Sequence, residues 1–196
     1  MRRRICYTLP AIPPQENKMT TSLPFPAPDE YAPFYADYIQ RAIARKDVLA
    51  ALSLQIDELH AALDPLTDEQ ALYKFGPAEW SIKELMSHLI DGERVFSYRL
   101  LRISRGDQTP LPGFDQEPYV RASGADGLAL KDLLQEFEYL RRANILAIRN
   151  MSAEAALRRG AASDATISAR ALIYIMVGHV EHHMACLHEK YLPALK

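Results

Sequence analysis

Four long stretches of the chain carry apolar residues every three or four positions, which is the spacing of one buried helix face. These stretches cover residues 31–63, 81–105, 128–151 and 168–191. None of them shows the regular alternation of apolar and polar residues that is typical of a half-buried strand. Four long helices without a convincing strand predict an all-α fold, and specifically a four-helix bundle.

Local signals indicate where these helices begin and end. Ser81-Ile-Lys-Glu84 has the capping-box pattern, in which the serine side chain and the glutamate side chain each bind a free backbone amide of the first turn. Gly106 is expected to end the same helix. The first apolar stretch is long enough that we expect a break near Arg45. Trp80, just before the cap, is interpreted as a hydrophobic staple that fixes the start of the helix.

A long loop is predicted between the second and third long helices. Residues 108–127 contain three prolines and three glycines, which disfavour a regular element. Loops of this length are often functional. Phe114, Asp115 and Tyr119 are candidates for a lid over a substrate, and the alternative is that the loop packs across the bundle end or forms a dimer contact.

The ends of the chain define the domain organisation. Residues 1–28 contain six prolines, which remove backbone donors and block a regular helix. This predicts a proline-rich flexible tail at 1–28 and one bundle domain at 29–196, the size of a typical single domain. A start at Met19 rather than Met1 would leave a more compact protein, and the true start is left open.

Composition and charge exclude several classes of protein. The formal net charge of −2 argues against nucleic-acid binding, and no stretch approaches the roughly 20 apolar residues of a membrane span. The segment after the three N-terminal arginines is too short and polar for an export signal. Cys6 and Cys186 match neither a disulfide framework nor a paired zinc site. We therefore expect a cytoplasmic protein, and apolar faces to spare favour a homodimer.

Two histidines of the last helix are candidates for metal ligands. At about 100° of rotation per residue, His179 and His183 fall within the apolar arc of this helix, one turn apart. His182 lies at the edge of the arc, and His188 points to the opposite side. Two imidazoles at this spacing project side by side and can hold one ion.

A third ligand is expected from the second long helix. His88 faces inward beside the apolar row of that helix, in a polar strip that also contains Arg99 and Arg102. Three histidines leave coordination positions open, which is typical of a catalytic site. Imidazole suits several divalent ions, so the ligands do not select the metal. The same pattern also fits a structural histidine cluster, and geometry alone does not decide between the two.

The motifs resemble those of the DinB-like superfamily of bacterial metalloenzymes, over roughly residues 28–192. The most specific stretch is Trp80-Ser-Ile-Lys-Glu-Leu-Met-Ser-His88-Leu-Ile-Asp91-Gly-Glu-Arg, and Gly178-His179-Val-Glu-His-His183 resembles the family's terminal histidine pair. The resemblance implies a four-helix bundle in which His88, His179 and His183 bind a divalent ion such as zinc, nickel, iron or manganese.

The same resemblance implies a range of reactions. Relatives include thiol-dependent transferases and isomerases that use bacillithiol, mycothiol or glutathione, and some hydrolases. It therefore predicts a metal-dependent S-transferase or hydrolase acting on a small molecule, with a low-molecular-weight thiol as a candidate cosubstrate. Metal in such a site activates a bound thiol or water. The alternatives are a non-catalytic metal- or small-molecule-binding stress protein and a purely structural, dimerising bundle.

Two carboxylates are candidates for roles beside the metal. Glu84 and Asp91 fall on the same side of the helix as His88, where each is expected to orient a histidine or to transfer a proton. The alternative is an ordinary solvated or salt-bridged helix face, with Arg99 or Arg102 as partner.

Overall fold

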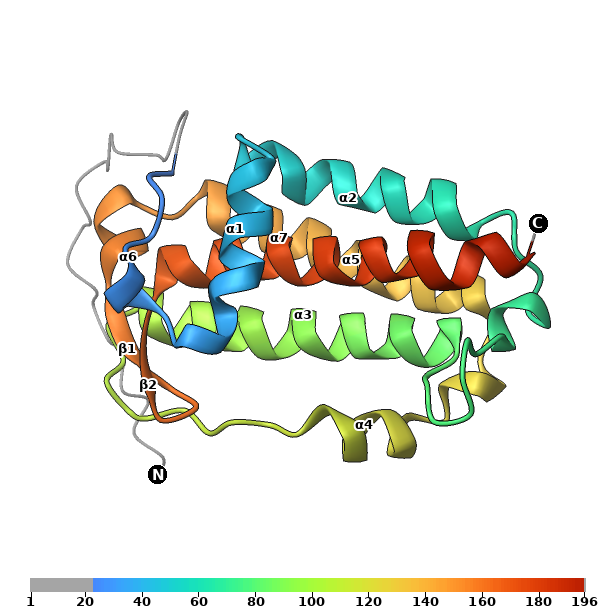
Figure 1. Ribbon diagram of the computed structural model, residues 1–196. Helices are drawn as coiled ribbons and strands as arrows, with labels where there is room; N and C mark the ends of the chain where they lie inside the picture. Colours follow the sequence, from blue (N-terminus) through green and yellow to red (C-terminus); the bar gives the residue numbers. More distant parts are fainter. Residues whose placement is uncertain (1–22, 196) are drawn as a thin grey trace, which may run out of the picture.

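The computed structural model describes residues 23–195, and four long helices dominate it (Figure 1). The elements, in chain order, are α1 (Ala36–Ala44), α2 (Val48–Leu63), α3 (Ile82–Ser104), α4 (Gln116–Ser123), α5 (Leu130–Arg149), α6 (Ala153–Leu157), β1 (Arg159–Ala162), β2 (Ala165–Ser168) and α7 (Ala169–Cys186). The helices α2, α3, α5 and α7 form the predicted four-helix bundle, so the all-α prediction is confirmed for the bulk of the fold.

The bundle has an uncommon order of helix directions. In Figure 1, α3 and α5 run in one direction while α2 and α7 run in the other. Each helix packs on its parallel neighbour and on one helix of the other pair, α3 on α7 and α2 on α5. A parallel pair such as α3 and α5 needs a connection that returns along the whole bundle. The long segment between them, predicted from its prolines and glycines, makes this return.

Helix boundaries follow the local chemistry of the sequence. Ser81 Oγ accepts the Glu84 amide at 3.0 Å and the Glu84 carboxylate accepts the Ser81 amide at 2.8 Å, so the capping box is confirmed. Gly106 follows the end of α3 with a positive φ of 81°. The predicted break near Arg45 is also present, because Lys46 adopts a φ of 65° and the Asp47 side chain caps α2.

Two predictions about the connections are wrong in detail. Residues 108–127 contain the eight-residue helix α4, which Asp115 caps and Gly124 ends with a positive φ. The strands β1 and β2 form an antiparallel hairpin whose turn residues, Ser163 and Asp164, both have positive φ. Each strand has only four residues, and Ile167 is the single large apolar residue of the two, which explains why the apolar pattern did not predict them.

The first helix crosses α7 at very close range. A side-chain carbon at Gly178 would collide with the backbone carbonyl of Tyr38, so only glycine permits this approach. The approach lays the Tyr38 ring over the histidines of α7. Residues 23–28 of the predicted tail also pack on α7, since Tyr174 donates a hydrogen bond of 2.6 Å to the carbonyl of Leu23. The rest of that tail, including Met1 and Met19, lies outside the described residues.

A buried ion pair joins all four long helices in the core. Arg141 of α5 is fully buried and makes two hydrogen bonds, of 2.9 and 2.8 Å, to the carboxylate of Glu93 on α3. It also donates to Gln55 of α2 and to the carbonyl of Met176 on α7. Because a buried charge is costly unless it is paired and hydrogen-bonded, this network fixes how the helices face one another.

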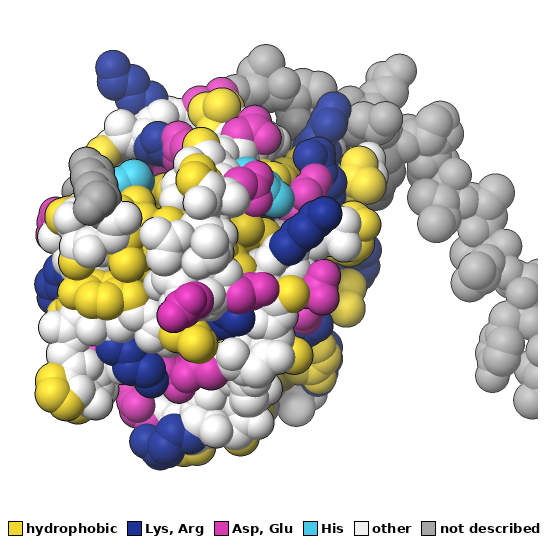
Figure 2. Space-filling view, turned by 90° about the vertical axis from the view of Figure 1, so that its right-hand side faces the viewer, with side chains coloured by type: hydrophobic (Ala, Val, Ile, Leu, Met, Phe, Trp, Pro, Cys, Tyr) yellow, Lys and Arg dark blue, Asp and Glu magenta, His cyan; other side chains and the backbone are white. Residues whose placement is uncertain are grey.

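The outer surface mixes charges of both signs. On the bundle end shown in Figure 2, basic and acidic side chains are interspersed among apolar ones. This face therefore lacks the single-sign basic stripe that phosphate-backbone binding uses. Among the helices of residues 23–195, none combines the length and apolar character that crossing a bilayer requires.

Candidate metal centre

The three histidines predicted as ligands lie together inside the bundle. His88 comes from α3, and His179 and His183 come from successive turns of α7. The three ring centroids are each 4.8 Å from the other two, and one potential ligand atom from each residue lies within 4.8 Å of the others. Contact between α3 and α7 thus brings together side chains that are 91 residues apart in the sequence.

A glycine beside the cluster makes room for one of the imidazoles. Gly92 follows His88 by one turn of α3, and a Cβ there would lie 2.6 Å from Cε1 of His179. Any side chain at this position would push the ring of His179 away from the other two. The close packing of the three histidines therefore requires glycine at position 92.

Gly92→Ala is expected to weaken divalent-metal binding by about 10- to 100-fold, the range seen when the support of a ligating histidine is disturbed. Competition with a coloured chelator measures the affinity. The matched control is Gly127→Ala, because a Cβ at Gly127 meets no atom within 4 Å. Unchanged metal affinity in the Gly92 variant would contradict the role of His179.

Aromatic rings enclose the histidines. The Trp80 ring lies 4.8 Å from that of His88, and the rings of Phe96 and Tyr38 each lie 5.5 Å from that of His179, all between centroids. Trp80 therefore contacts the cluster as well as preceding the cap of α3. This contact was not expected from the sequence, which assigned the residue to a staple.

Burial keeps the three imidazoles neutral. Removal from water lowers the pKa of His88 to about 4 and holds the pKa values of His179 and His183 well below their ordinary value. The neighbouring histidines add to the effect, since a second positive charge nearby is unfavourable. Neutral imidazole is the form that binds metal, so at neutral pH no proton has to leave.

These shifts predict how stability changes with pH in the metal-free protein. Between about pH 6.5 and 4 the unfolded chain protonates His88 and the folded chain does not, so stability is lost as pH falls through this window. The contribution of His88 is on the order of 3 kcal/mol. Urea unfolding at the two ends of the window measures it, and His88→Gln should show a shallower dependence. Equal slopes in the two proteins would contradict the assignment.

The residues present fit a bound divalent ion. His88 Nε2 and His179 Nε2 lie 2.9 Å apart and can share one hydrogen bond. His88 Nδ1 and His183 Nε2, however, are buried without a hydrogen-bond partner among the described residues. Buried polar atoms normally have a hydrogen-bond partner. Hydrogen bonds among the histidines alone leave these two nitrogens without one. Three neutral nitrogen donors are a ligand set that zinc, nickel and iron accept.

The histidines form one end of a pocket of about 430 Å³. Its wall combines α3 and α7 with side chains from α1, from the loop before α4 and from the hairpin turn. The lining residues are Phe34, Tyr35, Tyr38, Trp80, His88, Gly92, Phe96, Arg99, Gly113, Phe114, Gln116, Ser163, His179, His182 and His183. The pocket is within the size range of small-molecule sites.

The two candidate carboxylates are not brought to the histidines. Glu84 is held by the cap of α3 and by Lys74, whose Nζ lies 2.6 Å from its carboxylate. Asp91 lines a different pocket between α3, α4 and α5. Burial raises the pKa of Asp91. Neither residue lines the histidine pocket.

The predicted lid residues divide between two pockets. Phe114 lines the histidine pocket, while Tyr119 lines the pocket that contains Asp91. Asp115 caps α4. Several pocket residues were missed by the sequence analysis altogether, because they come from distant segments with no chemical motif. Tyr35, Tyr38 and Ser163 are in this group.

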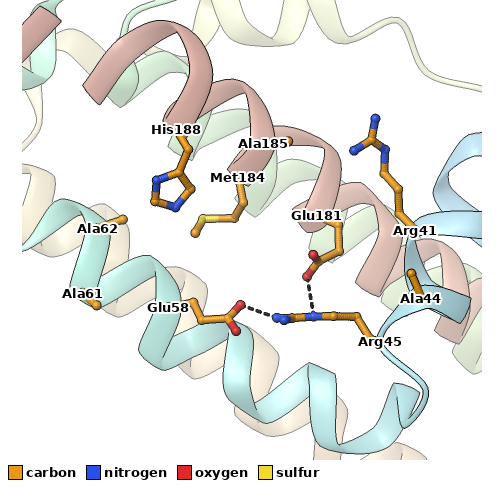
Figure 3. Close-up of a pocket in the computed structure, with 10 residues that line it drawn as sticks. All are labelled: Arg41, Ala44, Arg45, Glu58, Ala61, Ala62, Glu181, Met184, Ala185 and His188. Carbon is orange, nitrogen blue, oxygen red and sulfur yellow. Dashed lines mark hydrogen bonds and ion pairs between the residues drawn. The ribbon is translucent and has the colours of Figure 1, made fainter. Parts of the chain in front are cut away.

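A further pocket of about 660 Å³ lies beside α1, α2 and α7 (Figure 3). Its central cation, Arg45, points between two acids and forms ion pairs with Glu58 and Glu181. Arg41 at its edge is paired with Asp37. These charges neutralise one another, and the metal-ligand candidates lie in the other pocket.

Fold and site together define a four-helix bundle with a buried three-histidine cluster. The sequence model of the DinB superfamily matches residues 51–187. This span is more than half of the chain, and the protein therefore belongs to the DinB superfamily, as the sequence motifs indicated.

A solved structure supports the same fold. YfiT from Bacillus subtilis, described as a probable metal-dependent hydrolase with an unusual four-helix bundle topology, superposes with a TM-score of 0.67 at 18% sequence identity. The match covers 82% of this chain and 91% of YfiT. At this identity the likeness concerns the fold alone. Comparison with curated protein sequences gives no significant match.

Proposed function

We propose that this protein is a metal-dependent enzyme in which His88, His179 and His183 hold one divalent ion, and that it acts on a small molecule in the adjoining pocket. The observation that carries the proposal is the cluster itself: three imidazoles from two helices, two buried and one half-buried, at the end of a pocket of about 430 Å³. A description of YfiT as a probable metal-dependent hydrolase supports hydrolysis as the first reaction to test.

The bound ion would supply the central chemistry. A divalent metal with an open coordination position lowers the pKa of a water or thiol and so provides a nucleophile at neutral pH. Zinc, nickel, iron and manganese are all candidates, because three imidazoles do not discriminate strongly among them. A low-molecular-weight thiol is the alternative nucleophile, which would make the reaction an S-transfer.

The protein's own residues would contribute shielding and proton transfer. Trp80, Phe96 and Tyr38 surround the histidines and reduce access of bulk water. His182 is the best-placed group to carry a proton, because it lines the same pocket and its Nδ1 lies 3.6 Å from the carboxylate of Asp37. The nearby carboxylate can orient the imidazole. We propose His182 for this role in place of Glu84 and Asp91.

The test is a screen of the purified protein loaded separately with zinc, nickel, manganese and iron. Ester and amide hydrolysis form one arm, and conjugation of bacillithiol, mycothiol or glutathione to an electrophile forms the other. We expect turnover that disappears on chelation and that falls by about 100-fold or more in His182→Gln, the range that general acid–base groups contribute. Stoichiometric metal binding without turnover in either arm would contradict the enzyme and favour a binding protein.

A further inference from the structure

The histidine pocket contains a buried cation without an ionic partner. Arg99 of α3 is 2% exposed and lines the pocket with the three histidines. Its guanidinium donates to the Tyr35 hydroxyl at 3.3 Å, to the Pro112 carbonyl at 2.8 Å and to the Ser163 hydroxyl at 3.0 Å. All three partners are neutral, and within residues 23–195 no carboxylate lies within 4 Å of Arg99.

The other buried arginine of the described residues, Arg141, and the half-buried Arg170 each have an acidic partner. Arg141 is paired with Glu93 in the core, and Arg170 is paired with Glu30. In the described part of the chain, Arg105 and Arg149 also lack an ion pair, but both are exposed to water. A charge removed from water is expensive unless an opposite charge accompanies it. Arg99 is therefore the position at which a ligand would supply the missing negative charge.

The rest of the pocket suits an organic anion. Its lining includes no aspartate or glutamate, and the rings of Tyr35, Phe96 and Phe114 offer apolar surface. The three hydrogen bonds use both N–H groups of Nη2 and one of Nη1, so the Nε–H and one Nη1–H of Arg99 have no partner among the described residues. One positive charge balances one carboxylate, whereas a phosphate monoester carries up to about two negative charges at neutral pH.

The helix also sets where this anion would lie. His88, Gly92, Phe96 and Arg99 follow one another along one side of α3, and eleven residues of helix correspond to roughly 16 Å between the first and last Cα atoms. A carboxylate bound to Arg99 is thus separated from the histidines, with Phe96 between them. The reacting group must be another part of the same molecule.

We propose that the substrate is a small organic acid with an apolar body, whose carboxylate binds Arg99 while a separate bond is presented to the histidine end of the pocket. The part of this inference that concerns the reaction rests on the proposed metal-dependent activity. The binding step itself requires no metal and is tested without it.

Calorimetric titration of the metal-free, full-length protein with phenylacetate and its neutral isostere phenylacetamide tests the inference. We expect the wild type to bind phenylacetate about tenfold more tightly, the effect of one charge-assisted hydrogen bond. Arg99→Gln should lose this preference, and Arg99→Lys should restore part of it. Arg105→Gln, which removes an exposed arginine at the end of the same helix, should retain the preference in full.

Equal binding of the two probes by the wild type would overturn the inference, and this comparison needs no variant to fold. Preference retained in a folded Arg99→Gln protein would overturn it as well. Tighter binding of phenylphosphate than of phenylacetate would assign a phosphate ester instead. Metal content is measured separately on the same preparations, so a failure to bind metal contradicts the proposed function and leaves the carboxylate result intact.

Discussion

Replacing both His179 and His183 with alanine is expected to abolish divalent-metal binding, from close to one ion per chain to almost none. Two of the three proposed ligands are lost, and a single imidazole does not hold a divalent ion against competing buffer. Elemental analysis of protein purified without a metal-affinity tag measures the change.

The matched control for this variant is His188→Ala, because His188 follows α7 and is exposed. It should retain the full metal content. Circular dichroism establishes that each variant is folded, and His88→Asn provides a second, smaller change on the other helix. Full metal content in a folded His179/His183 double variant would show that the ion is held elsewhere.

Arg141→Met is expected to destabilise the protein by about 3–5 kcal/mol, because it leaves the carboxylate of Glu93 buried without its partner. Arg141 is fully buried and Glu93 is 2% exposed, so water cannot replace the lost interaction. The free energy of unfolding in urea, measured near neutral pH, reports the effect.

The comparison for this prediction is Arg94→Met, which breaks the exposed pair between Arg94 and Glu136. Exposed pairs contribute about 0–1 kcal/mol, so this variant should remain close to the wild type. Equal losses in the two variants would mean that the network around Arg141 does not hold the helices together.

Much of the fold was predictable from local features of the sequence. The four long helices follow from apolar spacing, and the start of α3 follows from Ser81 and Glu84, whose hydrogen bonds are local. The hairpin β1–β2 was not predicted, because its strands are too short to show a pattern of apolar residues. Its turn also depends on two residues with positive φ, which such a pattern does not reveal. The parallel course of α3 and α5 depends on tertiary packing, which helix periodicity does not reveal. The long segment between them was the one feature of the sequence consistent with it.

The site was predictable to a smaller extent. The one-turn spacing of His179 and His183 indicated that they lie side by side, and the inward position of His88 indicated a third member of the cluster. Glu84 and Asp91 lie on the same side of the helix wheel as His88. A helix wheel does not show, however, that Glu84 is held in the cap of α3 and that Asp91 lines a different pocket. Arg99 was placed in a polar strip, but its partners were not predicted. Tyr35 and Ser163 each lie 64 residues from Arg99 in the sequence, one before it and one after it.

X-ray absorption spectroscopy of the zinc-loaded protein tests the central claim most directly, because it identifies the atoms bound to the metal. The account predicts scattering from three imidazole ligands, which falls to two in His88→Ala. Zinc bound without imidazole ligands, or an imidazole number that does not change in this variant, would contradict the proposed centre.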